Sequence, residues 1–184
     1  MIEDAVVVLV DFQDKLLNLI PGSKCVLKSA LLLARLAELN NAPVVATKQI
    51  KLGEVIDEVR SAAGGRVIEK ETFSCFGCRE FVDAVKSTGR RTLIITGVET
   101  HICVLQTTID ALKRGYRVVI PIDAVASQIK KDYEAGIEYM KRAGAEVSSS
   151  ELIVYKELGT PRKPWFKKIL DYIKARRRAC ITGF

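Results

Sequence analysis

The sequence contains a single histidine, His101, and no Gly-x-Ser-x-Gly segment. A Ser-His-Asp triad would have to use that one histidine, and its serine would lack the usual motif. No apolar run approaches the roughly 20 residues that a membrane-spanning helix needs. The early run Ala5–Val10 is short and follows two acids, whereas a signal peptide begins with basic residues. We therefore expect neither a serine hydrolase of that kind nor a membrane protein, and we predict a cytoplasmic location.

The five cysteines stand at positions 25, 75, 78, 103 and 180. Their number is odd, their spacing is uneven and no export signal precedes them, so we expect no disulfide framework and at least one free thiol. Cys75 and Cys78 form a C-x-x-C pair, which can be redox-active or can supply half of a zinc site. A structural zinc needs two more ligands, and the sequence has no second pair of this kind. Packing is the plainer interpretation of these two thiols, and a redox role stays open.

The net charge of +7 comes from one end of the chain. Residues 1–160 hold 21 Lys and Arg against 21 Asp and Glu, whereas residues 161–184 hold eight bases against one acid, Asp171. Such a segment is commonly a solvated helix face with a frayed end, although it can also bind a phosphate-rich partner. We expect the first, so nucleic acid is not the expected partner.

The length and the pattern of the chain predict one α/β domain. No Ser- or Gly-rich linker divides the 184 residues, so we expect a single domain over 1–184, with a basic C-terminal helix and tail at 161–184. Short β-branched runs alternate with longer stretches of helical periodicity, which predicts a parallel sheet covered by helices on both faces, a three-layer α/β/α fold. The six predicted strands are residues 6–10, 44–47, 66–68, 92–95, 117–120 and 145–147.

Two prolines, at 161 and 164, precede a predicted final helix with an apolar stripe. The stripe consists of Trp165, Phe166, Ile169, Leu170 and Ile173. Large aromatic side chains need a covered position, so the stripe must pack on the chain's own core or on a second subunit. The sequence does not decide between these two arrangements.

Three side chains of complementary chemistry follow predicted strands. Asp11 comes directly after the first strand, Lys70 comes two residues after the third, and Cys103 lies beyond the fourth. Ligands of open parallel sheets bind at the carboxyl ends of the strands, so we expect these side chains to meet in one crevice. A thiolate attacks carbonyl carbon, Lys70 and a helix N-terminus would stabilise it, and Asp11 could take the thiol proton and return it to a leaving amine. Each residue alone has an ordinary structural explanation, and the combination indicates a thiol hydrolase.

His101 is a poor candidate for the base of Cys103. If the segment from Thr100 onward is helical, two residues two positions apart lie about 200° apart around the helix axis and do not face each other. We therefore expect His101 to be a pocket wall or a surface residue.

Several different short motifs follow one another along the chain. Residues 8–13 read VLVDFQ, residues 69–76 read EKETFSCF, and residues 97–107 read GVETHICVLQT; GYRV at 115–118 and DAVAS at 123–127 continue the pattern. In these motifs the sequence resembles the isochorismatase-like cysteine hydrolases, a superfamily that includes nicotinamidases and carbamoylsarcosine amidases. The resemblance covers roughly residues 4–150. It implies a three-layer α/β/α fold with a six-stranded parallel sheet, and subunits that assemble as dimers or larger.

The resemblance also implies site residues. Its Asp-Lys-Cys triad falls on Asp11, Lys70 and Cys103. A cis peptide bond is implied between Val98 and Glu99, and the amides of Glu99 and Cys103 would form an oxyanion hole for a tetrahedral intermediate. Weaker expectations for the walls of the substrate pocket fall on Gln13, Phe73, His101 and Thr107.

The sequence departs from two branches of this superfamily. Nicotinamidases carry an Asp and two His as a metal site after the second strand, whereas residues 47–53 here read TKQIKLG. Without those ligands we expect no metal and no other cofactor. Isochorismatases proper lack the nucleophilic cysteine, so Cys103 disfavours hydrolysis of a vinyl ether.

We therefore expect a cysteine hydrolase that cleaves a C–N bond of a small amide or carbamoyl compound through a thioester on Cys103. A homo-oligomer is expected, for which the stripe of the last helix offers a surface. One alternative is a non-catalytic protein that binds nucleic acid or another polyanion through its basic end. Another is a peroxide-responsive thiol protein that uses Cys103 with the 75/78 pair.

Overall fold

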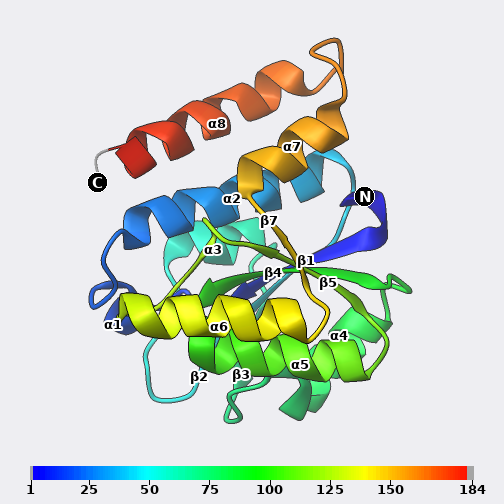
Figure 1. Cartoon of the computed structure of the whole chain (residues 1–184). Coiled ribbons are helices and arrows are strands. Elements are labelled where there is room, and N and C mark those ends of the chain that lie inside the picture. Colours follow the sequence, from blue (N-terminus) through cyan, green and yellow to red (C-terminus); the bar gives the residue numbers. More distant parts are fainter. Residues whose placement is uncertain (1, 182–184) are drawn as a thin grey trace.

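The computed structural model describes residues 2–181, which build a parallel sheet between layers of helices (Figure 1). The seven strands run in the order β3-β2-β1-β4-β5-β7, and β6 pairs with β4. Their bounds are β1 (Ala5–Val10), β2 (Val44–Gln49), β3 (Val67–Lys70), β4 (Thr92–Val98), β5 (Arg117–Pro121), β6 (Val125–Ala126) and β7 (Glu146–Ser148). Every predicted strand is present, and the two-residue β6 is an addition. The predicted three-layer fold is confirmed.

The helices divide between the two faces of the sheet. They are α1 (Asp14–Leu17), α2 (Ser23–Leu39), α3 (Asp57–Ala62), α4 (Arg79–Lys86), α5 (Leu105–Lys113), α6 (Lys130–Arg142), α7 (Ser150–Leu158) and α8 (Phe166–Ile181), with short turns η1 (Ile2–Asp4), η2 (Cys75–Gly77) and η3 (Thr100–Val104). Buried side chains of α2, α3, α7 and α8 belong to the core on one face, and those of α4, α5 and α6 to the core on the other. Within residues 2–181, no helix is long and apolar enough to cross a membrane.

The central strands are buried on both faces, as their continuous apolar sequences predict. In β1, Val7 and Leu9 face the core that α2 covers, whereas Val6, Val8 and Val10 face the opposite core. Each such side chain contributes about 1.5–3 kcal/mol by leaving water. A slip of one residue would exchange the two faces, so this burial fixes the register and aligns the carboxyl ends of β1 and its neighbours at one edge.

The final helix α8 packs along α2 of the same chain (Figure 1). Ile169 and Ile173 are buried there, and Trp165 and Phe166 are partly buried against the same core. The apolar stripe therefore lies on the chain's own core. Most of its apolar surface therefore packs inside the chain, which leaves less of it for the contact with a second subunit that the sequence suggested.

A disulfide bond joins Cys25, near the start of α2, to Cys180, near the end of α8. This bond corrects the expectation that the cysteines form no disulfide. The number and spacing of the cysteines do not show which helices pack together. The two bonded cysteines lie 155 positions apart in the sequence and meet only because α2 and α8 are in contact. Cys75, Cys78 and Cys103 are free, so the prediction of a free thiol is confirmed. Disulfides persist mainly in oxidising compartments, so this bond does not fit the predicted cytoplasmic location, which stays a prediction.

Replacing Cys180 by serine should lower the free energy of unfolding by about 2–4 kcal/mol, because the bond restricts the unfolded chain over a long loop. Urea unfolding under non-reducing conditions measures the change. The matched control is Cys78→Ser, which alters a free and only partly buried cysteine and should leave the midpoint nearly unchanged. Equal midpoints for wild type and Cys180→Ser would show that the bond does not form.

Candidate active site

The structure brings the side chains of Asp11, Lys70 and Cys103 together at the carboxyl edge of the sheet. Asp11 follows β1, Lys70 is the last residue of β3, and Cys103 lies in η3, a π-helical turn after β4. Lys70 Nζ lies 2.7 Å from Asp11 Oδ2 and 3.6 Å from Cys103 Sγ. The two charged side chains are fully buried, and Cys103 is 6% exposed. The ammonium thus contacts both the carboxylate and the thiol.

Residues at the end of β2 hold this ion pair in place. β2 lies between β1 and β3 in the sheet. Thr47 Oγ1 donates a hydrogen bond to Asp11 Oδ1 at 2.8 Å, and Lys70 Nζ donates to Gln49 Oε1 at 2.6 Å and to the Thr72 carbonyl at 3.3 Å. These bonds replace the water that both charges lose on burial. Thr47 and Gln49 were not among the predicted site residues, although they lie at the end of the second strand, beside the strands that carry Asp11 and Lys70.

Burial and the charges of the ion pair together shift the pKa values of Lys70 and Cys103. Burial lowers the pKa of the Lys70 ammonium, but Asp11 and the two nearby thiols raise it, and the net direction is upward. Burial raises the pKa of the Cys103 thiol to about 12, Asp11 adds to the rise, and Lys70 opposes it. Lys70 therefore lowers the pKa of the thiol, as expected, but burial and Asp11 together raise it by more. A pKa this high keeps Cys103 a neutral thiol at neutral pH, and the Asp11 carboxylate lies beside it.

A second buried thiol, Cys75, belongs to the same cluster. Its Sγ lies 3.8 Å from Thr47 Oγ1, and burial raises its pKa to about 12. Cys78, three residues later, instead directs its thiol to the Glu69 carbonyl at 3.6 Å. The two cysteines therefore occupy different surroundings, and a redox role for the pair stays a prediction.

His101 does not serve Cys103. Its Nδ1 lies 2.9 Å from Ser127 Oγ, and its Nε2 lies 3.9 Å from Asp132 Oδ2. The imidazole is thus occupied by residues of the segment after β6 and of α6. The expectation that His101 is not the base agrees with this geometry.

The loop between β4 and η3 has the backbone form that the resemblance implied. The peptide bond between Val98 and Glu99 is cis. The Glu99 carbonyl accepts hydrogen bonds from the amides of Ile102 and Val104, at 3.1 and 3.3 Å. Gly97 has a φ of 122°, and a Cβ there would lie 2.0 Å from the carbonyl oxygen of Val10. Only glycine fits that position, because β1 and β4 approach each other so closely.

The remaining predicted site residues have diverse positions. The Gln13 amide bonds to backbone, donating to the carbonyls of Gln49 and Gly53 and accepting from the Gln49 N–H. Thr107 Oγ1 accepts from the Cys75 amide at 3.0 Å. Phe73, in contrast, is 54% exposed. Gln13 and Thr107 therefore brace the loops around the site, and contact between any of these residues and a substrate stays a prediction.

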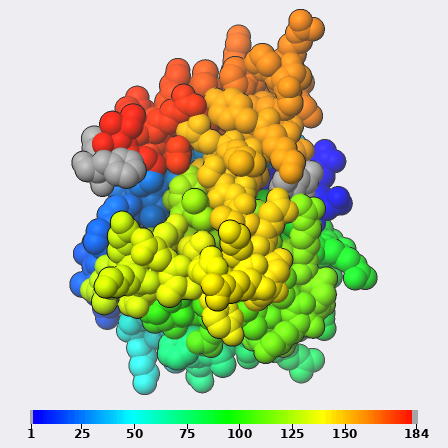
Figure 2. Space-filling model, viewed as in Figure 1, coloured from blue at the N-terminus to red at the C-terminus, as the bar shows by residue number. Residues whose placement is uncertain are grey.

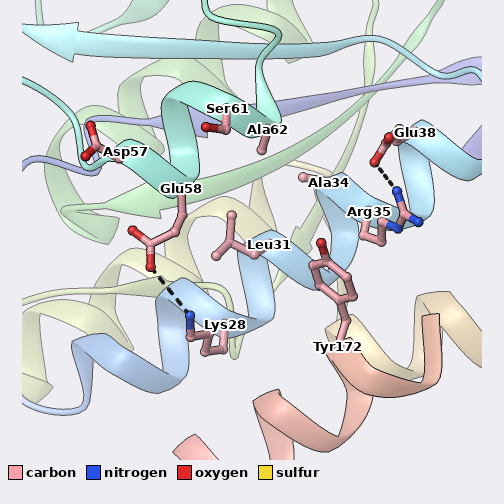
Figure 3. A pocket seen from close by; sticks show the side chains of 10 residues that line it. All are labelled: Lys28, Leu31, Ala34, Arg35, Glu38, Asp57, Glu58, Ser61, Ala62 and Tyr172. Atoms are coloured by element: carbon pink, nitrogen blue, oxygen red, sulfur yellow. Dashed lines mark hydrogen bonds and ion pairs between the residues drawn. The ribbon is translucent and has the colours of Figure 1, made fainter. Parts of the chain in front are cut away.

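A cavity of about 590 Å³ lies between α2, α3 and α8, and no residue of the triad lines it (Figure 3). Lys28 of α2 pairs with Glu58 of α3 at 3.7 Å, and Arg35 pairs with Glu38. These charges neutralise one another, so the cavity gives no reason to place the chemistry there. Across residues 2–181, no group of three or more His, Cys, Asp and Glu side chains is placed to hold a metal ion.

Residues 5–151 match the family described as the Isochorismatase domain. The chain belongs to the isochorismatase family. This family member is 32% identical over 145 residues to Isochorismatase family protein 2A of Dictyostelium discoideum, a match that covers 73% of this chain and 72% of the relative.

Two solved structures are similar over nearly the whole of this isochorismatase-family chain. The MAR1 ribonuclease of Caenorhabditis elegans has a TM-score of 0.83 at 27% identity, covering 92% of this chain and 88% of that one. The YcaC gene product of Escherichia coli has a TM-score of 0.84 at 25% identity, covering 98% and 94%, and is described as an octameric hydrolase of unknown specificity. The family membership supports a hydrolase without naming its substrate.

The two buried thiols predict a loss of stability at alkaline pH. Cys75 and Cys103 have pKa values raised from 9.0 to about 12 in the folded chain. Below pH 9.0 their contribution to stability is fully present. At higher pH the unfolded cysteines ionise first, so unfolding releases protons and stability falls as the pH rises toward the folded pKa. Each thiol can account for up to about 1.4 kcal/mol per pH unit.

Urea unfolding at about pH 8 and about pH 10 tests this linkage, with Cys75→Ala as the variant. The variant loses packing contacts, but between the two pH values it should lose about 1 kcal/mol less stability than wild type. The same loss in the variant and in wild type would show that Cys75 titrates normally.

Proposed function

We propose that the protein hydrolyses a C–N bond of a small amide or carbamoyl compound through a thioester on Cys103. The observation that supports this proposal is the contact of one buried ammonium, Lys70, with both a carboxylate and a thiol. Burying an ion pair costs desolvation free energy, and replacing such a pair by apolar residues is often neutral for stability. Stability alone therefore does not explain a buried cluster of this composition, which favours a chemical role.

In the first step Asp11 accepts the Cys103 proton as the sulfur attacks the carbonyl carbon. A thiol whose pKa is raised to about 12 makes a strong nucleophile once it is deprotonated, and a base in contact avoids any need for a standing thiolate. Lys70 stabilises the negative charge that passes from the carboxylate to the sulfur. The ammonium keeps its proton throughout, because its own pKa is raised.

The carbonyl oxygen becomes an oxyanion in the tetrahedral intermediate. In this proposal the backbone amides of Glu99 and Cys103 donate hydrogen bonds to it, in the loop that joins Val98 to η3. Asp11 then returns its proton to the nitrogen, the C–N bond breaks, and ammonia or an amine leaves. Water attacks the resulting thioester with Asp11 as the base, which releases the acid and restores the thiol.

The substrate class follows from the confinement of the nucleophile. Cys103 is 6% exposed and Asp11 and Lys70 are covered completely, so a small carbonyl group reaches the sulfur more easily than a folded chain or a large polymer. Phe73, which is exposed, and His101 are the proposed walls for the rest of the molecule. The proposal uses no metal and no cofactor.

We also propose that the protein assembles with copies of itself, because the similar YcaC protein is octameric. Most of the apolar stripe of α8 packs inside the chain. Figure 2 views the molecule onto α6 and α7, the face on which β7 forms the edge of the sheet. Exposed large apolar side chains on these elements are Tyr139, Val147, Leu152 and Tyr155. An unpaired strand edge flanked by such residues suits a contact between identical subunits.

A second candidate function is the binding of RNA or another polyanion by the basic end, since one similar structure is described as a ribonuclease. Two arginines of α8 are neutralised by acids, so exposed positive charge there rests largely on Lys167, Lys168 and Lys174. RNA binding that weakens steeply with salt and is lost when these lysines become glutamates would support this function. Binding that is insensitive to those changes would contradict it.

Ammonia release from a panel of small primary amides, ureido acids and carbamoyl compounds tests the proposed hydrolysis. Wild type should turn over at least one member of the panel, and Cys103→Ala should lose that turnover by several orders of magnitude. The matched control is Cys75→Ala, which removes a thiol of the same cluster that has no proposed chemical step. Its turnover should persist.

Equal turnover by wild type and Cys103→Ala would contradict the proposal. Asp11→Asn adds a second test, because the amide keeps the shape of the carboxylate but cannot take the thiol proton. Its turnover should fall as far as that of the cysteine variant.

A further inference from the structure

Arg176 of α8 uses all three nitrogens of its guanidinium group in contacts inside the chain. Its Nε donates to Ser29 Oγ of α2 at 3.3 Å, its Nη1 to Glu151 Oε1 of α7 at 2.9 Å, and its Nη2 to Asp123 Oδ2 at 2.9 Å. The side chain is 19% exposed, and those of Asp123 and Glu151 are 14% and 19% exposed. One residue near the end of the last helix thus joins three separate elements.

Of the three residues that Arg176 binds, Asp123 is the one that connects it to the candidate active site. It lies between β5 and β6, and its Oδ1 accepts a hydrogen bond from the Ser150 amide at 2.7 Å. Its Oδ2 accepts from the Ser150 hydroxyl as well as from Arg176. The carboxylate therefore fixes the beginning of the segment that runs from 123 to 128.

That segment contacts residues 97–103, the oxyanion loop, through three hydrogen bonds and a short strand pairing. The Ala124 carbonyl accepts from the Gly97 amide at 2.9 Å, and β6 pairs with the end of β4, with Val125 opposite Gly97 and Ala126 opposite Val98. The contacts of its last two residues are the Gln128 amide donating to Glu99 Oε2 at 2.8 Å and Ser127 Oγ at 2.9 Å from His101 Nδ1. The segment thus pairs with the backbone before the Val98–Glu99 bond and holds the side chains of Glu99 and His101 after it.

We infer that Arg176 is a positioning residue for the oxyanion loop: through Asp123 it holds residues 124–128 in the place from which they orient the Glu99 amide. This inference rests on the proposed function, because the Glu99 amide matters to catalysis only if an oxyanion forms there. Arg176 touches no reacting group. Its effect is on the geometry of a hydrogen bond to the transition state, and an error of about 1 Å in such geometry can cost about 100-fold in rate.

The neighbouring Arg177 provides a matched control. It lies on the same helix and binds the same acid, with Nε and Nη2 at 2.9 and 2.8 Å from Glu151. Within residues 2–181 it makes no hydrogen bond or ion pair with Asp123, whereas Arg176 binds both acids. Loss of Arg176 leaves Glu151 still paired but leaves Asp123 without its cation, so the two variants separate positioning of the loop from general stability of α8.

The experiment compares wild type, Arg176→Gln and Arg177→Gln by amide hydrogen exchange and by steady-state kinetics. In Arg176→Gln the amides of Gly97 and Gln128 should exchange faster, while amides of β1 should exchange at the wild-type rate. kcat on a substrate found in the amide panel should fall about 10- to 100-fold with KM nearly unchanged, because the lost interaction is with the transition state. Arg177→Gln should match wild type in exchange at both sites and in kcat.

Unchanged exchange at Gly97 and Gln128 in Arg176→Gln overturns the inference, and so does faster exchange with an unchanged kcat. If wild type hydrolyses no amide, the proposed function fails, whereas the exchange measurement still decides whether Arg176 holds the loop. Asp123→Asn serves as a second variant if Arg176→Gln does not fold. It keeps a shape that can bond to Ser150 and loses the charge that Arg176 binds, so it should show the same faster exchange.

Discussion

Asp11 and Lys70 form an ion pair that water does not reach, because both side chains are fully buried. Removal of one member of such a pair would leave an uncompensated charge, at a cost of about 3–5 kcal/mol. The pair therefore constrains its surroundings: Thr47, Gln49 and Thr72 must supply the hydrogen bonds that the two charges would otherwise take from water. The alignment of β1, β2 and β3 at one edge of the sheet makes that arrangement possible.

The proposed chemistry of Cys103 depends on the same pair. Burial raises the pKa of the thiol, the Asp11 carboxylate raises it further, and the Lys70 ammonium opposes both. Transfer of the thiol proton to Asp11 removes the charge that disfavours a thiolate and leaves the charge that favours it. In the proposed mechanism, one proton transfer therefore both creates the nucleophile and stabilises it.

Much of the fold could be predicted because the central strands are continuous apolar runs, and the order of strand and helix implies a parallel sheet. The convergence of Asp11, Lys70 and Cys103 followed from that prediction, since all three residues follow strands. Thr47 and Gln49 were missed because a threonine and a glutamine at a strand end carry no chemical signal of their own. β6 was missed because it has only two residues, too few to show a strand-like pattern of apolar residues in the sequence.

The arrangement of α8 could not be obtained from the sequence. Its apolar stripe fits an intramolecular and an intermolecular contact equally well, and only the packing on α2 distinguishes them. The disulfide between Cys25 and Cys180 and the contacts of Arg176 depend on that packing, so they were equally hidden. Composition predicted a solvated helix face for the basic segment and could not show that Arg176 and Arg177 neutralise acids of the fold.

The measurement that tests the central claim most directly is mass spectrometry of the protein quenched in acid during turnover of a small amide. A thioester intermediate predicts that the peptide containing Cys103 gains the mass of the acyl group, and that Cys103→Ala shows no adduct. Turnover that gives neither an adduct on Cys103 nor, when hydroxylamine is added to capture the acyl group, a hydroxamate would contradict the account. An adduct confined to another residue would contradict it as well.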